Sequence, residues 1–510
     1  MYNLNLVPGY NVIRKFFPYI AIVVTFYSIF GGIQKSKFGF VDDHEIVTFN
    51  ESISVKTDQF SNFFNSIYRK TEVGQFGKYP RFRPSYYFLR FSEIQFFKLN
   101  AAKYYKFRIF IGIIFFCYIF YFLNRFFYTI PLLFGIFFLL SDFYWTDIFF
   151  RIGPAEFYCL VGLLLLLMAF DLRFNANTKM ALYVLAMLIL LGSKENFFPF
   201  LIFGLYLLFD DFYHSKVIRP LLIAMFSLPC IYAMIIVWSL LLNFSNAPVD
   251  IYGNSVTFLD RFNKFLEIFF HAEFWILLLI SSYVEFTGSN KFNIKLRLFF
   301  HFALLNFIFN FIFYNGNWPD MNRYNIPGFF LYKFATMLFI LKSLSCRTDE
   351  FNSKMIIVTS ITLILPFQGG TFRNISEKMN SDLFAREKIY FNLNYLKQVY
   401  NTESDAVIIL PSHPFDHELT WSFVTQMHNL VPALFFYVEP VIPEQKNVIL
   451  FEGLTNDLYS KSENGDVTWH ILPKRNQKKS YEKCFIVTFH SLGSLEKRSN
   501  CKSSILINFE

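Results

Sequence analysis

Residues 107–123 read FRIFIGIIFFCYIFYFL, and residues 126–141 follow as FFYTIPLLFGIFFLLS after a break of only Asn124 and Arg125. A helix needs roughly 20 apolar residues to cross the hydrocarbon core of a bilayer, and fewer when aromatic residues flank it. This stretch therefore predicts membrane-spanning helices.

The composition of the whole chain points the same way. Of its 510 residues, 54% are hydrophobic, 73 are Phe and only 17% are charged, whereas a soluble domain carries about 25% charged residues. These values exclude a soluble enzyme and a disordered protein. The net charge of +9 is concentrated in short loops between apolar runs, as expected of cytoplasmic loops. No Lys/Arg-rich run indicates nucleic acid as a partner.

The predicted fold class is a membrane all-α bundle of about eleven transmembrane helices within residues 1–370. Arg14 and Lys15 precede the first apolar run, which reads as a retained signal anchor and places the N-terminus in the cytoplasm. An odd number of spans then places the C-terminus outside. The runs are 16–33, 107–123, 126–141, 156–170, 180–193, 197–209, 220–243, 273–287, 297–314, 328–344 and 355–368.

Two regions outside the spans have a pattern of their own. Within the outer loop 34–106, residues 58–68 and 85–99 have the spacing of amphipathic helices at the membrane surface or capping the bundle. Residues 371–510 are predicted to form a small extracytoplasmic α/β domain, with a helical linker at 376–400 and short strands after Asp405. Cys484 and Cys501 would pair if that domain faces an oxidising space.

The polar residues expected on the outer side are the functional candidates, because such residues are costly close to a membrane. Asp42, Asp43 and Glu45 form an acidic cluster after the first span. A carboxylate there suits a general base or a ligand of a divalent cation. The alternative is a solvated acidic loop that caps a helix.

Two basic motifs accompany this acidic cluster. Arg81 and Arg83 lie in a Pro-stiffened segment that suits phosphate recognition or, alternatively, lipid-headgroup anchoring. Lys194 and Glu195 lie between two apolar runs with almost no loop, where an ion pair is costly unless it lines a wet cavity or binds a ligand. The alternative is that Lys194 extends to the membrane interface.

The order of these motifs along the chain resembles the GT-C superfamily of multi-span glycosyltransferases, which use polyprenyl-phosphate sugars. The resemblance covers about residues 1–370. Its motifs are Asp42-Asp43, Arg81-Phe82-Arg83-Pro84, Arg151-Ile152-Gly153-Pro154-Ala155-Glu156, Ser193-Lys194-Glu195 and Arg323-Tyr324-Asn325-Ile326-Pro327.

The resemblance implies that Asp42 or Asp43 deprotonates an acceptor hydroxyl for a single inverting displacement. The leaving group is a lipid phosphate, which needs cations rather than a general acid. Metal use differs among members of the superfamily, so Asp42, Asp43 and Glu45 are the ligands if a divalent cation binds. The residues implied to bind substrate are Glu45, Arg81, Arg83, Arg151, Glu156, Lys194, Glu195, Tyr252, Arg323 and Tyr324.

The expected partners are membrane lipids, the lipid-linked sugar, and a glycan, lipid or protein acceptor. The expected location is a bacterial inner membrane with the active face in the periplasm; the endoplasmic reticulum membrane is the alternative. Other functions stay open: a transporter or flippase for lipid-linked sugars, a glycan polymerase or ligase, or a non-catalytic scaffold. A transporter would distribute its charged residues across the bilayer depth and interrupt its helices near the midplane.

Overall fold

We describe a computed structural model of the chain. It describes residues 8–40, 43, 46, 50, 83–171, 173–217, 219–246, 263, 265–286, 294–313, 323–345, 350–402, 406–412, 422–423, 426, 435–440, 470–471, 481–488 and 501–508. The first helices are α1 (Pro8–Phe30), η1 (Gly31–Lys35), α4 (Pro84–Phe97), α5 (Ala101–Leu123), α6 (Thr129–Leu140), α7 (Tyr144–Phe150), α8 (Glu156–Ala169) and α9 (Ala176–Leu191). They are followed by η2 (Glu195–Leu201), α10 (Ile202–Ser215), α11 (Pro220–Asn246), η3 (Ile268–Phe270), α13 (Ala272–Phe286), α14 (Ile294–Phe313), η4 (Arg323–Asn325), α15 (Gly328–Ser345) and α16 (Glu350–Thr402).

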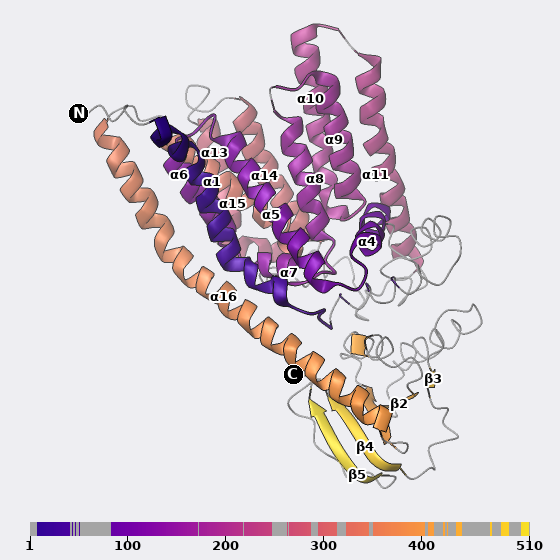
Figure 1. The fold of residues 1–510 in the computed structure, drawn as a ribbon. Helices are drawn as coiled ribbons and strands as arrows, with labels where there is room; N and C mark the ends of the chain where they lie inside the picture. The colour runs from indigo at the N-terminus through magenta and orange to yellow at the C-terminus, as the bar shows by residue number, and fades with distance from the viewer. Residues whose placement is uncertain are drawn as a thin grey trace.

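The long helices form a bundle (Figure 1), and several are apolar enough to cross a membrane. Five helical segments of the described residues have the length and composition of a span: Phe16–Lys35, Ala101–Leu123, Glu195–Ser215, Pro220–Trp238 and Ile294–Phe311. A sixth is formed if α6 and α7, which are bent by 75° relative to each other, count as one. The protein is therefore an integral membrane protein.

The predicted number of about eleven spans exceeds these five or six, although each predicted run falls largely within a helix. For the runs at 156–170 and 180–193 the difference is one of helix length. Helices α8 and α9 have 14 and 16 residues, which at 1.5 Å per residue gives about 21–24 Å, less than a hydrocarbon core of about 30 Å. The run at 126–141 is likewise divided, because α6 has 12 residues and the chain then turns into α7.

Aromatic side chains fill the contact between α1, α5 and α7. The Phe26 ring lies 5.1 Å from that of Phe149 in an edge-on arrangement, and the Phe116 ring lies 5.3 Å from that of Trp145. A Cβ atom at Gly112 would come within 2.4 Å of Phe26 and 2.9 Å of Phe149. Glycine at this position of α5 therefore permits the close approach of α1 and α7.

Helix α16 is 53 residues long, or about 80 Å at 1.5 Å per residue. It runs obliquely past the bundle and continues to the strands beyond the end where α4 and α7 lie (Figure 1). The helix is continuous through residue 370, so the backbone has no break at the domain boundary expected from the sequence. The predicted linker helix at 376–400 is the second half of this one helix.

Five strands of the C-terminal region are described: β1 (Ala406–Ser412), β2 (Phe435–Pro440), β3 (His470–Ile471), β4 (Tyr481–Thr488) and β5 (Cys501–Asn508). They pair in the order β3-β2-β1-β4-β5, and every pairing is parallel. Cys484 lies opposite Ser504, and Cys501 lies opposite Tyr481. Three residues of offset correspond to about 10 Å along a strand, and a disulfide needs Cα atoms within about 7 Å. The predicted pairing of Cys484 with Cys501 is therefore wrong in this register.

Candidate functional site

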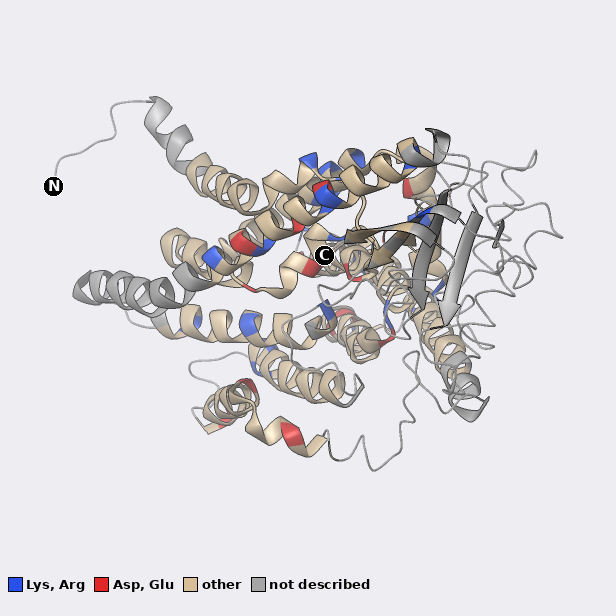
Figure 2. Cartoon of the chain, turned by 90° about the horizontal axis from the view of Figure 1, so that it is seen from below, with Lys and Arg blue, Asp and Glu red and all other residues tan. Residues whose placement is uncertain are grey.

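The described site residues lie at helix ends on one side of the bundle. Their positions are the residue before α4 (Arg83), the residue after α7 (Arg151), the start of α8 (Glu156), the residue before η2 (Lys194), the start of η2 (Glu195), and η4 (Arg323, Tyr324). Viewed from this end (Figure 2), Lys, Arg, Asp and Glu interrupt the otherwise uncharged helices. Helix ends leave backbone groups unsatisfied, so polar side chains gather there at lower cost than in the middle of a span.

Two buried ion pairs form the centre of the arrangement. The Arg83 guanidinium meets both carboxylate oxygens of Glu195, with Nη2 3.1 Å from each. Lys194 Nζ lies 2.7 Å from Oε1 of Glu156. All four residues are at most 4% exposed. The adjacent Lys194 and Glu195 thus pair with Glu156 and Arg83, and the chain changes there from the extended backbone of Lys194 to the 3-10 helix that begins at Glu195.

Tyr324 lies directly beside the Lys194 ammonium group. Nζ of Lys194 lies 4.4 Å from the centre of the Tyr324 ring, and the Arg323 guanidinium lies 5.3 Å from the same ring. Asp147 connects these groups to the end of α7: it accepts a hydrogen bond from the Arg323 backbone N–H at 3.3 Å and lies 3.5 Å from Arg151 Nε. The structure therefore brings together every described substrate-binding residue that the sequence predicts.

Two asparagines that the sequence reasoning missed hold Tyr324 in place. Asn196, fully buried in η2, donates to Asn310 Oδ1 at 2.6 Å and to the Ile326 carbonyl at 2.7 Å. Asn310 donates in turn to the Tyr324 carbonyl at 3.2 Å. An amide within an apolar helix such as α14 is a usable sequence signal, because it is expensive in a membrane bundle unless it has a partner.

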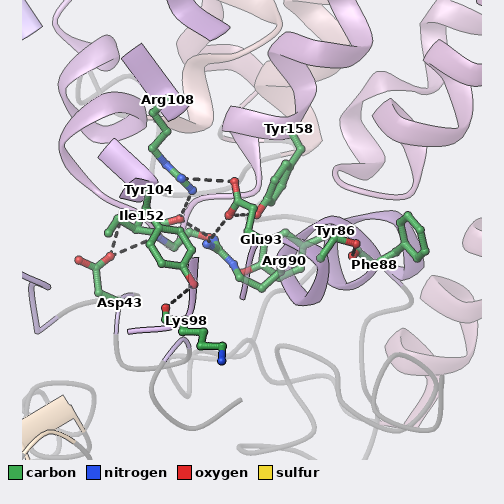
Figure 3. Close-up of polar contacts among 12 residues, drawn as sticks. Asp43, Tyr86, Phe88, Arg90, Glu93, Lys98, Tyr104, Arg108, Ile152 and Tyr158 are labelled. Carbon is green, nitrogen blue, oxygen red and sulfur yellow. Dashed lines mark hydrogen bonds and ion pairs between the residues drawn. The ribbon is translucent and has the colours of Figure 1, made fainter. Parts of the chain in front are cut away.

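Asp43 is fully buried, and both oxygens of its carboxylate accept hydrogen bonds; the contact with the backbone at Ile152 is drawn in Figure 3. Oδ1 accepts from the backbone N–H groups of Ile152 and Gly153 at 2.8 and 3.2 Å. Oδ2 accepts from the Gly39 N–H at 2.6 Å and from the Tyr105 hydroxyl at 3.4 Å. Four donors match the acceptor capacity of a carboxylate. These contacts are those of a structural group that joins the first loop to the turn after α7.

The carbonyl side of the same turn is held by cations that the sequence reasoning missed. Arg90 and Arg108, both fully buried, donate to the Ile152 carbonyl, and Arg90 also donates to that of Gly153 at 2.6 Å. Glu93 lies between the two guanidinium groups at 3.3 and 3.4 Å and accepts from Tyr158 at 2.6 Å (Figure 3). The signal was present, since Arg108 interrupts the apolar run 107–123 with a charge.

Helix α4 corresponds to the amphipathic helix expected at 85–99, and it buries two charged residues together with the apolar positions Tyr86 and Ile94. Arg90 and Glu93 point into the protein, whereas Phe88 and Phe96 are 47% and 78% exposed. The reason is the pairing just described, which lowers the cost of burying the charges. The exposed Phe side chains suit contact with the membrane interface.

Four predicted site residues, Asp42, Glu45, Arg81 and Tyr252, lie outside the described residues, as does the helix expected at 58–68. In the part of the chain that the structure describes, no three His, Cys, Asp or Glu side chains are grouped as metal ligands. The acidic cluster, of which only Asp43 is described, therefore remains the one metal site that the sequence suggests.

The ionisable groups around Lys194 suit an anionic ligand. The described groups are four cations, Arg83, Arg151, Lys194 and Arg323, and three anions, Asp147, Glu156 and Glu195. Each carboxylate lies beside one of these cations and restricts its position, as Glu156 does for Lys194. Cations held in advance in a low-dielectric site stabilise phosphoryl oxygens more strongly than they would in water.

Comparisons of the chain with protein-family models, with curated proteins and with solved structures find no match. The residue contacts and the order of the sequence motifs are therefore the basis for a functional proposal.

Proposed function

We propose that the protein is an integral-membrane glycosyltransferase of the GT-C type, which transfers a sugar from a polyprenyl-phosphate donor to an acceptor on the extracytoplasmic face. The observation that carries the proposal is the arrangement of Lys194, paired with Glu156 at 2.7 Å and set against the Tyr324 ring. Together with the buried Arg83–Glu195 pair it provides oriented cations at one end of a membrane bundle. A lipid-linked phosphate reaches such a position from within the bilayer.

In the proposed reaction, a carboxylate of the first loop removes the proton of the acceptor hydroxyl. The resulting oxygen attacks the anomeric carbon as the bond from that carbon to the phosphate oxygen breaks, which inverts the configuration. The polyprenyl phosphate leaves with an additional negative charge, and the cations near Lys194 stabilise that charge. Because four donors engage Asp43, we assign the base to Asp42 and leave Asp43 a structural role.

The strands of residues 406–508 lie beyond the same end of the bundle as the site (Figure 1). This placement supports a C-terminal extracytoplasmic domain close to the acceptor side. We propose a bacterial inner membrane, with the site and residues 371–510 in the periplasm.

The test uses purified full-length protein in liposomes that contain a panel of polyprenyl-phosphate sugars and a mixture of glycan and lipid acceptors. Mass spectrometry measures the release of polyprenyl phosphate and the mass gain of the acceptor. Lys194→Met serves as the inactive variant and Arg373→Gln as the control, since Arg373 is 80% exposed in an ion pair with Glu377 on α16. Movement of the intact lipid-linked sugar across the bilayer without release would favour a flippase and would contradict the proposal.

A further inference from the structure

The C-terminal half of α16 inserts a buried cation into the contact between the first loop and the turn after α7. Arg386 is 7% exposed, although it belongs to a region that the sequence presents as a separate domain. Its Nη1 donates to Ser36 Oγ and to the Lys37 carbonyl, each at 3.2 Å. It also donates to the Tyr105 hydroxyl, and its Nη2 donates to the Phe150 carbonyl.

Arg386 and Asp43 act on the same three segments. Both contact the Tyr105 hydroxyl, which also donates to the Phe150 carbonyl at 3.3 Å. Gly39 lies between them: a Cβ atom there would be 3.4 Å from Asp43 Oδ2 and 3.5 Å from the Arg386 guanidinium carbon. The start of the first loop, helix α5 and the end of α7 are thus joined by one buried network.

A second contact of the C-terminal region reaches the same loop independently. Gln426, 4% exposed, donates to the Gly39 carbonyl at 2.8 Å. Phe423, fully buried, packs edge-on against Phe40 with ring centres 6.3 Å apart. Residues far apart in the chain therefore contact Gly39 and Phe40, which lie shortly before the acidic cluster.

We propose that Arg386 and Tyr105 are positioning residues, which fix the first loop and the turn after α7, from which Arg151 and Glu156 extend to the Lys194 group. On this view residues 371–510 are part of the site and not an appended domain. The inference rests on the proposed function for its kinetic consequences. Its structural consequence is that Arg386 and Tyr105 keep the turn at Ile152–Gly153 in place, and this can be tested without any enzymatic activity.

The chain offers matched controls for both residues. Tyr104 and Tyr105 are adjacent and fully buried. The Tyr104 hydroxyl, however, donates to the carbonyl of Lys98, between α4 and α5, at 2.9 Å. Arg373 lies on α16 with Arg386 but is exposed. Tyr105→Phe is therefore compared with Tyr104→Phe, and Arg386→Lys with Arg373→Lys, in the full chain. Lysine keeps the charge but cannot span the four acceptors of Arg386.

The first readout is steady-state transfer, normalised to the folded fraction measured by thermal melting. We expect Tyr105→Phe and Arg386→Lys to lower kcat at least tenfold while the KM for the lipid donor stays within about twofold, because the turn is misplaced but the phosphate cations remain. The double variant should fall no further than the lower single variant, since both changes break one network. Equal kcat in variants and controls, or a loss accounted for by unfolded protein, overturns the proposal.

The second readout needs no substrate. Cys159 is fully buried in the second turn of α8, six residues after Gly153. In a background in which the other five cysteines are serine, we measure its labelling by a membrane-permeant maleimide. We expect labelling at least fivefold faster in Tyr105→Phe and Arg386→Lys than in their controls. If the variants label at the same rate as their controls, the positioning role is overturned, even if the wild-type protein catalyses transfer. If the wild-type protein catalyses no transfer but the variants label faster as expected, only the proposed function is contradicted.

Discussion

Replacement of Lys194 tests the site most directly, because its ammonium group has both a structural and a chemical partner. The 2.7 Å contact with Glu156 is almost fully buried. At an effective dielectric constant of 20 the gross attraction is about 6 kcal/mol, most of which offsets desolvation. Removing one partner of such a pair typically costs about 3–5 kcal/mol of stability, because it leaves the other charge buried and unpaired.

The chemical effect of the same change is expected to be separate. If the ammonium group stabilises the departing phosphate, its loss costs about 2.7–4 kcal/mol of transition-state stabilisation, or roughly 100- to 1000-fold in rate. Lys194→Met keeps most of the side-chain volume and removes the charge. We therefore expect it to lower both the melting temperature and kcat at a saturating concentration of lipid donor.

A second variant separates the two effects. Lys194→Met combined with Glu156→Gln removes the orphaned carboxylate charge, so the melting temperature should recover most of its loss. The transfer rate should not recover, because the phosphate still lacks its cation. Proteoliposome assays of the single and double variants with a labelled donor give both quantities. Recovery of the rate together with the stability, or a single-variant rate within threefold of wild type, would refute the role of Lys194 in transfer.

Three further outcomes follow from the same contacts. Asp42→Asn should abolish transfer without lowering the melting temperature, whereas Asp43→Asn should lower both; the opposite result, in activity assays with melting curves, would return the base to Asp43. Hydrogen bonds from Arg125 and Arg173 hold the pKa of Asp171 well below its usual value. The ionised Asp171 side chain therefore contributes fully to the stability of the folded protein above about pH 4, and this contribution is lost as the pH falls further. Asp171→Asn should thus lower the melting temperature at pH 7 and leave the transfer rate unchanged, with a stability difference from wild type that shrinks in acid. A reporter fused after Glu510 should be active only outside the cytoplasm, and cytoplasmic activity would reverse the assigned face.

The sequence predicted the membrane class and singled out Lys194 and Glu195 as candidates for clear physical reasons. A long apolar run is stable as a helix within the bilayer, so residues 107–123 indicated helix α5 with little ambiguity. Polar residues at the ends of such runs are costly, which singled out Lys194 and Glu195. Their partners were not predictable, because Arg83 and Glu156 come close only through the packing of α4, α8 and η2.

The turn after α7 shows a second limit. Arg-Ile-Gly-Pro was recognised as a motif, but its backbone is held by Asp43 on one side and by Arg90 and Arg108 on the other. Backbone hydrogen bonds to distant side chains leave no periodic signal in a sequence. The parallel register that separates Cys484 from Cys501 is likewise a tertiary property, since short strands without a hairpin turn do not specify their neighbours.

Helix α16 also makes the far end of the chain responsive to the lipid around it. A rigid rod of about 80 Å moves its tip by about 7 Å for each 5° of tilt, and membrane helices adjust their tilt to the thickness of the bilayer. Arg386 lies part-way along this rod and is bound to both Tyr105 and the first loop. If the bilayer changes the tilt of α16, Arg386 moves with the helix and shifts the segments that it contacts at Ser36, Tyr105 and Phe150.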